Sequence, residues 1–431
     1  MNTIYKYPPR EIWKNLISRN VLKQENLKAA VQEIFDQVAE NGDCALKQLT
    51  LKYDRAELET FLVSESEINA AEALVSEKLK AAIATAKANI YTFHAAQKED
   101  FGKIETMPGV SCWRVSRAIA KVGLYIPGGS APLFSTVLML AVPAQIAGCR
   151  EVILCTPPRA DGSIDPAVLF TAKLCGISKI YKVGGAQAIA AMNFGTESIP
   201  KVDKIFGPGN QYVTQAKMLA TDYNIAVDLP AGPSEVLVIA DRTAVPAFCA
   251  ADLLAQAEHG TDSQVIFIAV DEEIFTQTLN EVSLQLEMLP RRDIAAEALE
   301  NSRFILLDSV ESALEFSNLY APEHLILSVE RAEDYLNDVA SAGSVFLGNY
   351  TPESVGDYAS GTNHTLPTNG FASSYSGVSL DSFVKKITVQ QITVDGLQNI
   401  GQTVEIMAEA EGLSAHKNAV SIRLKMIKDG I

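Results

Sequence analysis

The histidines of this 431-residue chain are the natural starting point, because an imidazole has an ordinary pKa of about 6.5 and exchanges protons near neutral pH. His324 directly follows Glu323 in Ala-Pro-Glu-His, which places two bases side by side. On extended backbone they would face opposite ways, whereas a turn would let them converge. The pair is a candidate for proton transfer, and a solvated loop pair is the alternative. His94 lies in a helical tract and is interpreted as a half-buried surface residue.

A second group of side chains could hold a metal ion. Gln256 and His259 are three residues apart at a predicted helix end and would share a face; interaction with the helix dipole is the alternative reading. Asp357 and His364 stand on a glycine-rich irregular segment, and His416 stands between the last two helices. Gln256, His259, Asp357 and His416 offer two nitrogens and two oxygens, which suits Zn²⁺, although glutamine is outside its commonest ligands. Mn²⁺ or Co²⁺ could substitute.

Three glycine turns could bind phosphates through free backbone N–H groups, because each follows a predicted strand and leads into a helical pattern. The turns are Tyr125-Ile-Pro-Gly-Gly-Ser130, Val183-Gly-Gly-Ala-Gln187 and Gly207-Pro-Gly-Asn210. The Gly-x-Gly-x-x-Gly dinucleotide fingerprint is absent. Together the three turns predict a ligand cleft at the ends of successive strands.

The elements that must position these residues read as α/β with mostly parallel sheets. A helical pattern covers residues 26–96, and short apolar runs alternate with helical patterns afterwards. Strands are predicted at 120–126, 151–155, 179–183, 201–205, 235–240 and 264–270. Residues 140–156 and 254–268 repeat one order, helix then glycine then strand, which indicates an internal duplication. Gly148 and Gly260 would end their helices in the left-handed conformation.

The C-terminal segment differs from the alternating middle of the chain. Residues 381–393 are predicted as a strand or mixed segment, and helices are predicted at 397–410 and 414–428. Gly412 is predicted to stop the first helix, and Ser414 to cap the second. Such a tail can wrap around its own core or around that of a partner.

Composition excludes several classes of protein. The 52 acids and 36 bases give a net charge of −16, which argues against nucleic-acid binding. The most apolar stretch, 137–149, is too short to span a membrane, and the N-terminus lacks a secretory apolar core. Six cysteines without CxxC spacing favour free thiols and a reducing, cytoplasmic location.

Seven strings, in family order and over nearly the whole chain from about residue 25, resemble histidinol dehydrogenase. They are Val122-Gly-Leu-Tyr-Ile-Pro-Gly-Gly129, Phe206-Gly-Pro-Gly-Asn210, Ala231-Gly-Pro-Ser-Glu235, Gln256-Ala-Glu-His-Gly260, Pro322-Glu-His324, Gly356-Asp-Tyr-Ala-Ser-Gly-Thr-Asn-His364 and Ala415-His-Lys417. The ensemble is specific, although no single string is. The resemblance implies a homodimer with shared active sites and oxidation of L-histidinol to L-histidine through an aldehyde, with two NAD molecules used in turn.

The resemblance also assigns roles to individual residues. One zinc ion per subunit would be held by Gln256, His259, Asp357 and His416. Glu323 and His324 would be the acid–base residues, and Tyr125, Gln187 and Asn210 would contact NAD. The substrate would be surrounded by Ser234, Gln256, His259, His324, Asp357, Glu411 and His416. His416 and Glu411 would reach the partner's site. A zinc hydrolase with the same ligands is the alternative function, but it leaves the glycine turns without a role.

The implied fold is two incomplete Rossmann-like α/β/α domains with helical dimerisation arms at both ends. The N-terminal arm would cover residues 1–24. The first domain, carrying metal and substrate, would combine 25–119 with 236–377, and the second, binding NAD, would cover 120–235. Residues 378–431 would form the C-terminal dimerisation arm.

Overall fold

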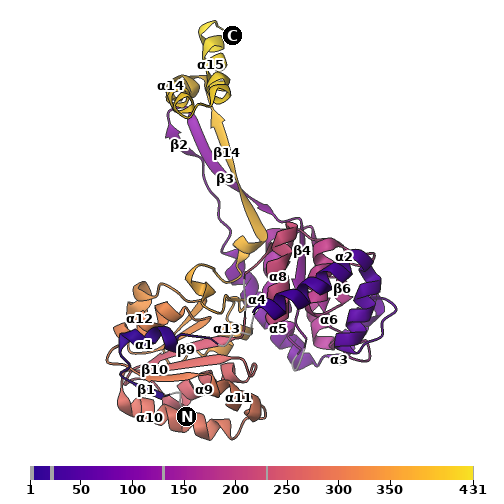
Figure 1. Ribbon diagram of the computed structural model, residues 1–431, viewed down its shortest axis with the longest axis vertical. Helices are drawn as coiled ribbons and strands as arrows, with labels where there is room; N and C mark the ends of the chain where they lie inside the picture. Colours follow the sequence, from indigo (N-terminus) through magenta and orange to yellow (C-terminus); the bar gives the residue numbers. More distant parts are fainter. Residues whose placement is uncertain (1–3, 20–23, 129–131, 230–231, 431) are drawn as a thin grey trace. The chain divides into compact units, whose positions relative to one another are not determined.

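The computed structural model describes residues 4–19, 24–128, 132–229 and 232–430, and its elements are shown in Figure 1. Gly129, Ser130 and Ala231 of the glycine-containing strings lie outside these residues. The chain divides into two compact units. Unit 1 comprises residues 1–97 and 119–383, and unit 2 comprises residues 98–118 and 384–431.

Unit 1 contains a six-stranded parallel sheet in the order β1-β11-β10-β9-β12-β13. Its strands are β1 (Ile4–Lys6), β9 (Glu235–Ala240), β10 (Gln264–Ala269), β11 (Arg303–Leu306), β12 (His324–Ser328) and β13 (Ser344–Leu347). Every residue of β9 and β10 is buried, as expected of a parallel sheet covered on both faces.

Alternate residues of β9 enter different cores, because successive side chains point to opposite faces of a strand. Val236 and Val238 pack with α9 (Pro246–Ala257), α10 (Glu272–Leu286) and α11 (Arg292–Glu300). Leu237 and Ile239 pack with α1 (Arg10–Leu16) and α12 (Val310–Tyr320), and Figure 1 shows the two helix layers on opposite sides of the sheet. The short helix α13 (Glu353–Tyr358) follows β13.

A five-stranded parallel sheet in unit 1 has the order β6-β5-β4-β7-β8. Its strands are β4 (Lys121–Tyr125), β5 (Glu151–Thr156), β6 (Lys179–Lys182), β7 (Lys204–Phe206) and β8 (Ala226–Val227). Counted along the chain within each sheet, both sheets follow the strand order 3-2-1-4-5, with β1 added at one edge of the larger. This shared order supports the predicted duplication.

Helices on both faces of the five-stranded sheet include three from the N-terminal part of the chain. The helices are α2 (Gln24–Asp54), α3 (Glu65–Leu74), α4 (Glu77–Ala95), α5 (Phe134–Ala147), α6 (Pro166–Leu174), α7 (Gly185–Phe194) and α8 (Gln211–Ala220). Ile83 and Ile90 of α4 pack in the core of Leu124, while Phe35 of α2 packs in the core of Ile153. Helices α2, α3 and α4 therefore share cores with the five-stranded sheet, whereas residues 25–119 were predicted to form one domain with 236–377.

Unit 2 is built on an antiparallel sheet in the order β14-β3-β2. Its elements are β2 (Ile104–Met107), β3 (Val110–Ala118), β14 (Val384–Ile392), α14 (Val394–Ala410) and α15 (Ser414–Lys428). Residues 98–118, for which no strand was predicted, share this unit with residues 384–431, most of the predicted C-terminal arm. No described helix of the protein is long and apolar enough to cross a membrane.

The structure tests four predicted helix signals. Gly148 ends α5 in the left-handed conformation with φ 82°, and Gly412 follows α14 with φ 73°, as predicted. Gly260 is not left-handed, because α9 already ends at Ala257 with Glu258 as its C-cap. Ser414 is the first residue of α15 and its side chain makes no cap, so the prediction of Ser414 as N-cap is wrong.

Candidate active site and cofactor cavity

The amino ends of β9 and β12 hold the two predicted bases. Glu323 immediately precedes β12, and His324 is its first residue. The N–H of Glu235, the first residue of β9, donates to Oε2 of Glu323 at 2.8 Å, and Nδ1 of His324 lies 3.1 Å from the Glu235 carbonyl oxygen. One backbone residue therefore orients both side chains, and the turn lets them converge.

The Glu235 carbonyl also fixes the tautomer of His324. Because a carbonyl only accepts, Nδ1 must carry the hydrogen, which leaves Nε2 as the basic nitrogen in the neutral ring. Nε2 is buried and has no hydrogen-bond partner among the described residues; Oδ1 of Asp357 lies 3.6 Å away. A buried basic nitrogen without a partner suits a group that receives a proton from a substrate.

Carboxylates surround His324 and set the electrostatics of the site. Oε2 of Glu323 and Oε1 of Glu353 lie 3.7 and 3.9 Å from Nδ1. Burial acts to lower the pKa of His324, but Glu353, Glu323 and Asp357 raise it well above its ordinary value. Burial raises the pKa of Glu323 to about 8 and that of Glu353 well above its usual range. The pKa of Asp357 is lowered, because the interaction with His324 outweighs its burial.

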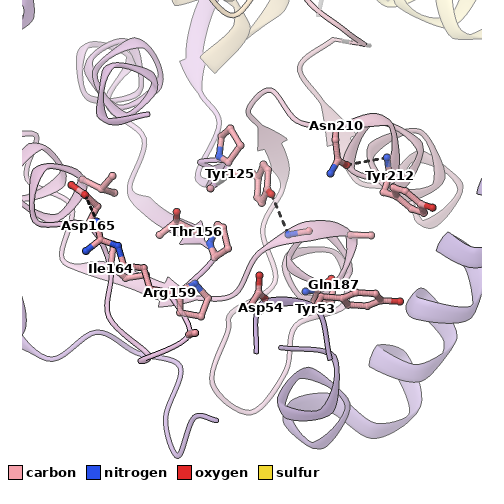
Figure 2. Close-up of a pocket in the computed structure, with 18 of the residues that line it drawn as sticks. Tyr53, Asp54, Tyr125, Thr156, Arg159, Ile164, Asp165, Gln187, Asn210 and Tyr212 are labelled. Carbon is pink, nitrogen blue, oxygen red and sulfur yellow. Dashed lines mark hydrogen bonds and ion pairs between the residues drawn. The ribbon is translucent and has the colours of Figure 1, made fainter. Parts of the chain in front are cut away.

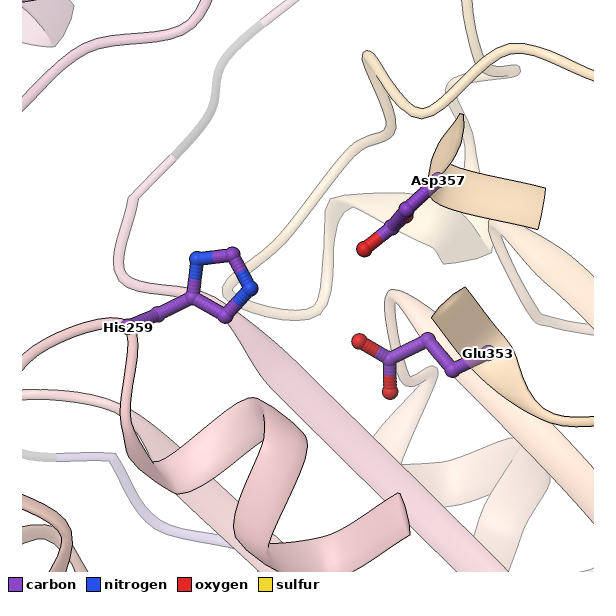
Figure 3. A group of neighbouring side chains, drawn as sticks. All are labelled: His259, Glu353 and Asp357. Carbon is purple, nitrogen blue, oxygen red and sulfur yellow. The ribbon is translucent and has the colours of Figure 1, made fainter. Parts of the chain in front are cut away.

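His259, Glu353 and Asp357 form a group of possible metal ligands. Figure 3 shows the imidazole facing the two carboxylates, and their ligand atoms lie within 4.8 Å of one another. Glu353 and Asp357 are four residues apart on α13 and so share one helix face. Glu353 was not among the predicted site residues; its spacing from Asp357 was the available signal.

Gln256 lies in the last turn of α9 and contacts this group. Its amide lies between Oε1 of Glu353 and the Glu235 N–H, and the orientation that satisfies both neighbours turns the amide nitrogen toward Glu353 and the oxygen toward the Glu235 nitrogen, 2.8 Å away. Asp252, one turn earlier on α9, accepts a hydrogen bond from the Glu353 N–H, and burial raises its pKa to about 7. Helix α9 therefore positions α13 as well as Gln256.

His364 and His94 serve as supports in the structure. Nδ1 of His364 lies 2.8 Å from the Asp357 carbonyl oxygen, and its Nε2 lies 3.0 Å from Oγ1 of Thr136. His94 is fully buried, with Nδ1 2.9 Å from the Ile90 carbonyl oxygen, so its prediction as a half-buried surface residue is wrong. The inner face of α4 carries it into the core.

The structure brings together five of the predicted metal, substrate and catalytic residues in unit 1. These are Gln256, His259, Glu323, His324 and Asp357. Ser234 directly precedes β9, and its carbonyl accepts from the Gln264 N–H at 3.1 Å. Glu411 and His416 belong to unit 2, at the C-cap of α14 and in the first turn of α15, and both are exposed. Their predicted roles remain predictions.

The carboxyl ends of the five-stranded sheet line a cavity of about 840 Å³. Tyr125, Gln187 and Asn210, predicted to contact the dinucleotide, all line it (Figure 2). The hydroxyl of Tyr125 accepts from the Gly185 N–H at 3.1 Å, and burial raises the pKa of Tyr125 to about 12. Neighbouring strands β4 and β7 lead to helices on opposite faces, a switch point where α/β sheets bind ligands.

A buried ion pair clamps the turn that leads to Asn210. Gly207 donates its N–H to Asp228 at 2.7 Å, and its carbonyl oxygen accepts from Nζ of Lys217 at 2.9 Å. Lys217 and Asp228 also pair with each other, with side chains only 3% and 0% exposed. Gly207 has φ 132°, and a Cβ there would lie 2.0 Å from the Tyr125 carbonyl oxygen, so only glycine fits.

The six cysteines are free. Burial raises the pKa of Cys149 and Cys175 to about 11 and that of Cys249 to about 12. Cys155 is fully buried and its pKa is raised further. These four thiols are thus held protonated, which disfavours a thiolate nucleophile.

Comparisons with known proteins agree with this geometry. Residues 17–424 match the family model described as histidinol dehydrogenase. The chain is 56% identical over 428 residues to histidinol dehydrogenase of Bacteroides thetaiotaomicron, covering 99% of this chain and 100% of the relative. It is 51% identical over 421 residues to that of Yersinia pestis, covering 97% and 94%. A crystal structure of histidinol dehydrogenase from Elizabethkingia anophelis is 60% identical, with TM-score 0.97, covering 99% and 98%.

Proposed function

Because the chain belongs to the histidinol dehydrogenase family, we propose that it oxidises L-histidinol to L-histidine through L-histidinaldehyde in two NAD-dependent steps. The observation that carries this proposal is the arrangement at Glu235. Its backbone orients Glu323 and His324 side by side, next to the His259–Glu353–Asp357 group. Two oriented bases suit a reaction that removes protons in two successive oxidations.

The donor group in unit 1 fits a zinc ion. One imidazole and two carboxylates converge, and these are ligand types that zinc accepts. His259, Asp357 and Gln256 would hold the ion, with Glu353 either binding it or orienting Gln256. When bound, zinc supplies an electrophilic template for the nitrogen donors of histidinol. Added positive charge here would also lower the pKa of His324 toward the range of a useful base.

In the first oxidation, Nε2 of His324 takes the proton of the substrate hydroxyl while the carbinol C–H bond breaks and its hydride leaves. The Glu235 carbonyl holds the ring in the required tautomer throughout. When bound, NAD supplies the acceptor for that hydride. Burial of His324 and Glu323 keeps competing water away from the transfer.

In the second oxidation, Glu323 takes a proton from a water molecule as its oxygen attacks the aldehyde carbon. The pKa of Glu323, raised to about 8, makes its carboxylate a stronger base than an ordinary one. His324 then takes a hydroxyl proton of the hydrate as the second hydride leaves. Because Glu323 and His324 each take one proton, the carboxylate of L-histidine, two protons and a second reduced cofactor result from this step.

The cavity of the five-stranded sheet fits the dinucleotide. Nε2 of Gln187 is buried without a hydrogen-bond partner among the described residues, so the cavity holds a donor that a ligand could satisfy. Tyr125 and Asn210 would contact NAD beside it. The free cysteines agree with a cytoplasmic location, where NAD is available.

Unit 2 supports assembly as a homodimer. Helix α15 has no buried residue, although it carries apolar side chains such as Ile422 and Met426. Such a face needs a partner surface, and a second copy would provide it. His416 and Glu411 would then complete the partner subunit's site. We expect His416→Asn to lower the zinc affinity at least tenfold without changing the helical content. If the variant keeps its zinc in the presence of a competing chelator as well as the unaltered protein does, His416 is not a zinc ligand.

The decisive experiment measures NADH formed from L-histidinol by the purified protein, before and after chelation and zinc restoration. About two NADH per histidinol, lost on chelation and restored by zinc, are expected from the proposed two-step chemistry. A folded, zinc-loaded protein that forms no NADH would contradict the proposal. Hydrolysis of an amide or ester of histidine by that sample would favour the alternative zinc hydrolase.

A further inference from the structure

Asp54 lies in the wall of the cavity at the five-stranded sheet. It is the last residue of α2, and the chain leaves the helix through Arg55 in the left-handed conformation with φ 60°. The next residue, Ala56, is fully buried. Figure 2 shows Asp54 among the residues that line the cavity, together with Tyr125 and Gln187. Its position is therefore fixed by the backbone and not by a hydrogen bond of its own side chain.

The half-buried carboxylate of Asp54 lacks the hydrogen-bond partners that a carboxylate removed from water normally has. Its Oδ2 atom is buried and has no hydrogen-bond partner among the described residues. Burial raises the pKa of Asp54 to about 6, since no cation or donor offsets the loss of water. Buried polar atoms are nearly always paired in native proteins, so an unpaired one in a cavity wall points to a ligand that supplies the donor.

The chemistry of the cavity narrows the choice of donor. An ionised carboxylate only accepts hydrogen bonds and repels phosphate. Among the described lining residues, Arg159 is the one basic side chain; it is 58% exposed and pairs with Asp165. Arg159 can therefore form an ion pair with a phosphate, whereas Asp54 requires a neutral O–H or N–H group that donates a hydrogen bond to it. A dinucleotide offers such groups mainly as ribose hydroxyls.

We propose that Asp54 is a cofactor-binding residue whose carboxylate accepts a hydrogen bond from a ribose hydroxyl of NAD. The inference rests on the proposed function, because it takes the cavity to be the NAD site. It adds a residue that no glycine turn contains and that lies on α2, far in sequence from Tyr125, Gln187 and Asn210.

The test combines substitutions of Asp54 with analogues of NAD that lack single ribose hydroxyls. Binding of NAD to the zinc-loaded enzyme without histidinol is compared with binding of its 2′-deoxy and 3′-deoxy forms at each ribose. In the unaltered protein we expect one analogue to bind about tenfold or more weakly than NAD. In Asp54→Ala we expect NAD to lose about the same factor and that analogue to lose none. If the deoxy analogue binds more weakly than NAD by the same factor in the unaltered protein and in Asp54→Ala, the proposal is overturned.

Thermal unfolding separates ligand binding from a structural role. Without NAD, we expect Asp54→Asn to unfold at an equal or higher temperature, because a buried unpaired charge is removed. With saturating NAD, the same variant should gain less in unfolding temperature than the unaltered protein. A lower unfolding temperature without NAD, combined with an unchanged gain on adding it, would assign Asp54 a structural role and overturn the proposal.

Two matched variants complete the design. Glu40→Gln removes an exposed acid from the same helix and should leave NAD binding unchanged. Gln187→Ala tests the cavity itself. If Gln187→Ala weakens NAD binding and Asp54→Ala does not, the inference alone fails. If neither variant weakens it, the assignment of the cavity to NAD fails as well.

Discussion

The two parallel sheets of unit 1 share the strand order 3-2-1-4-5 but carry their functional groups at opposite edges. In the five-stranded sheet, Tyr125 and the turn at Gly207 lie at the carboxyl ends of β4 and β7. In the six-stranded sheet, Glu235 and His324 are the first residues of β9 and β12, so the bases lie at the amino ends. The same topology thus supports two different kinds of site.

The difference follows from what each edge of such a sheet presents. At the carboxyl ends, strands lead into helix N-termini, whose free N–H groups and positive dipole suit phosphates. At the amino ends, helices finish, and the side chains of their last turns converge with the first residues of the strands. Gln256 and His259 arrive there from the end of α9. The carboxyl ends therefore offer backbone N–H groups beside the cavity, and the amino ends collect titratable side chains.

The largest expected effect is at the amino ends of β9 and β12, where the two proposed bases lie. His324→Asn keeps a polar group of similar size but removes the base, so both oxidations should slow by about 10³-fold. Steady-state rates with histidinol and with histidinaldehyde measure this, and zinc content is the control for an intact site. A loss confined to one of the two substrates would contradict a base shared by both steps.

At the carboxyl edge, Lys217→Met should destabilise the protein by about 3–5 kcal/mol, because it leaves the buried Asp228 unpaired. The surviving folded protein should show a raised KM for NAD with little change in kcat, since the turn before Asn210 loses its clamp. Lys173→Met, which breaks an exposed pair with Glu72, is the matched control and should change stability by less than about 1 kcal/mol. If Lys217→Met and Lys173→Met have equal effects on stability and on the KM for NAD, the Lys217–Asp228 pair does not position the turn for NAD binding.

Glu323→Gln separates the two bases within the amino edge. Its amide cannot take a proton from water, so oxidation of the aldehyde should slow by about 10²-fold, while oxidation of the alcohol changes much less. Rapid mixing of the variant with each substrate measures the two steps apart. Equal slowing of both would show that Glu323 acts in the alcohol step too.

The smallest expected effect concerns the stability of the amino edge against pH. Burial raises the pKa of Asp252 from 3.8 to about 7, so the folded chain keeps a proton that the unfolded chain releases between those values. The stabilising contribution of protonated Asp252 to the free energy of unfolding is fully present below about pH 4. It is lost as the pH rises through 7, at up to about 1.4 kcal/mol per pH unit. Asp252→Asn should therefore gain about 2 kcal/mol relative to the unaltered protein between pH 5 and 6.5.

Denaturant unfolding at the two pH values measures this gain. The exposed Asp222→Asn is the control and should show no such difference. If the free energy of unfolding changes with pH by the same amount in the unaltered protein and in Asp252→Asn, Asp252 titrates normally.

Sequence patterns predicted the strands of both sheet centres because these are continuous apolar runs, such as β9 and β10. They missed β3, whose polar and apolar residues alternate irregularly and whose pairing partner β14 lies about 270 residues away, as in Val115 opposite Ile387. Local periodicity carries no information about such a long-range pair.

The site was predictable to the extent that its residues are chemically distinctive. Histidines and the adjacent Glu323 stand out in the sequence, and the structure places them with Gln256 and Asp357. Glu353 was missed because an acid after a proline in a first helical turn is the ordinary way to begin a helix. Asp54 could not be singled out from the sequence because its distinguishing feature, a buried Oδ2 atom without a partner among the described residues, is visible only in the packing.

Strand β1 has a consequence for how the protein is made. Ile4 pairs with Phe304, so β1 leaves the ribosome 300 residues before its partner β11. The five-stranded sheet and its helices lie within residues 24–229 and are complete earlier. The nascent chain should therefore build the five-stranded sheet first, while β1 is still unpaired, and complete the six-stranded sheet only after β11, β12 and β13 have emerged.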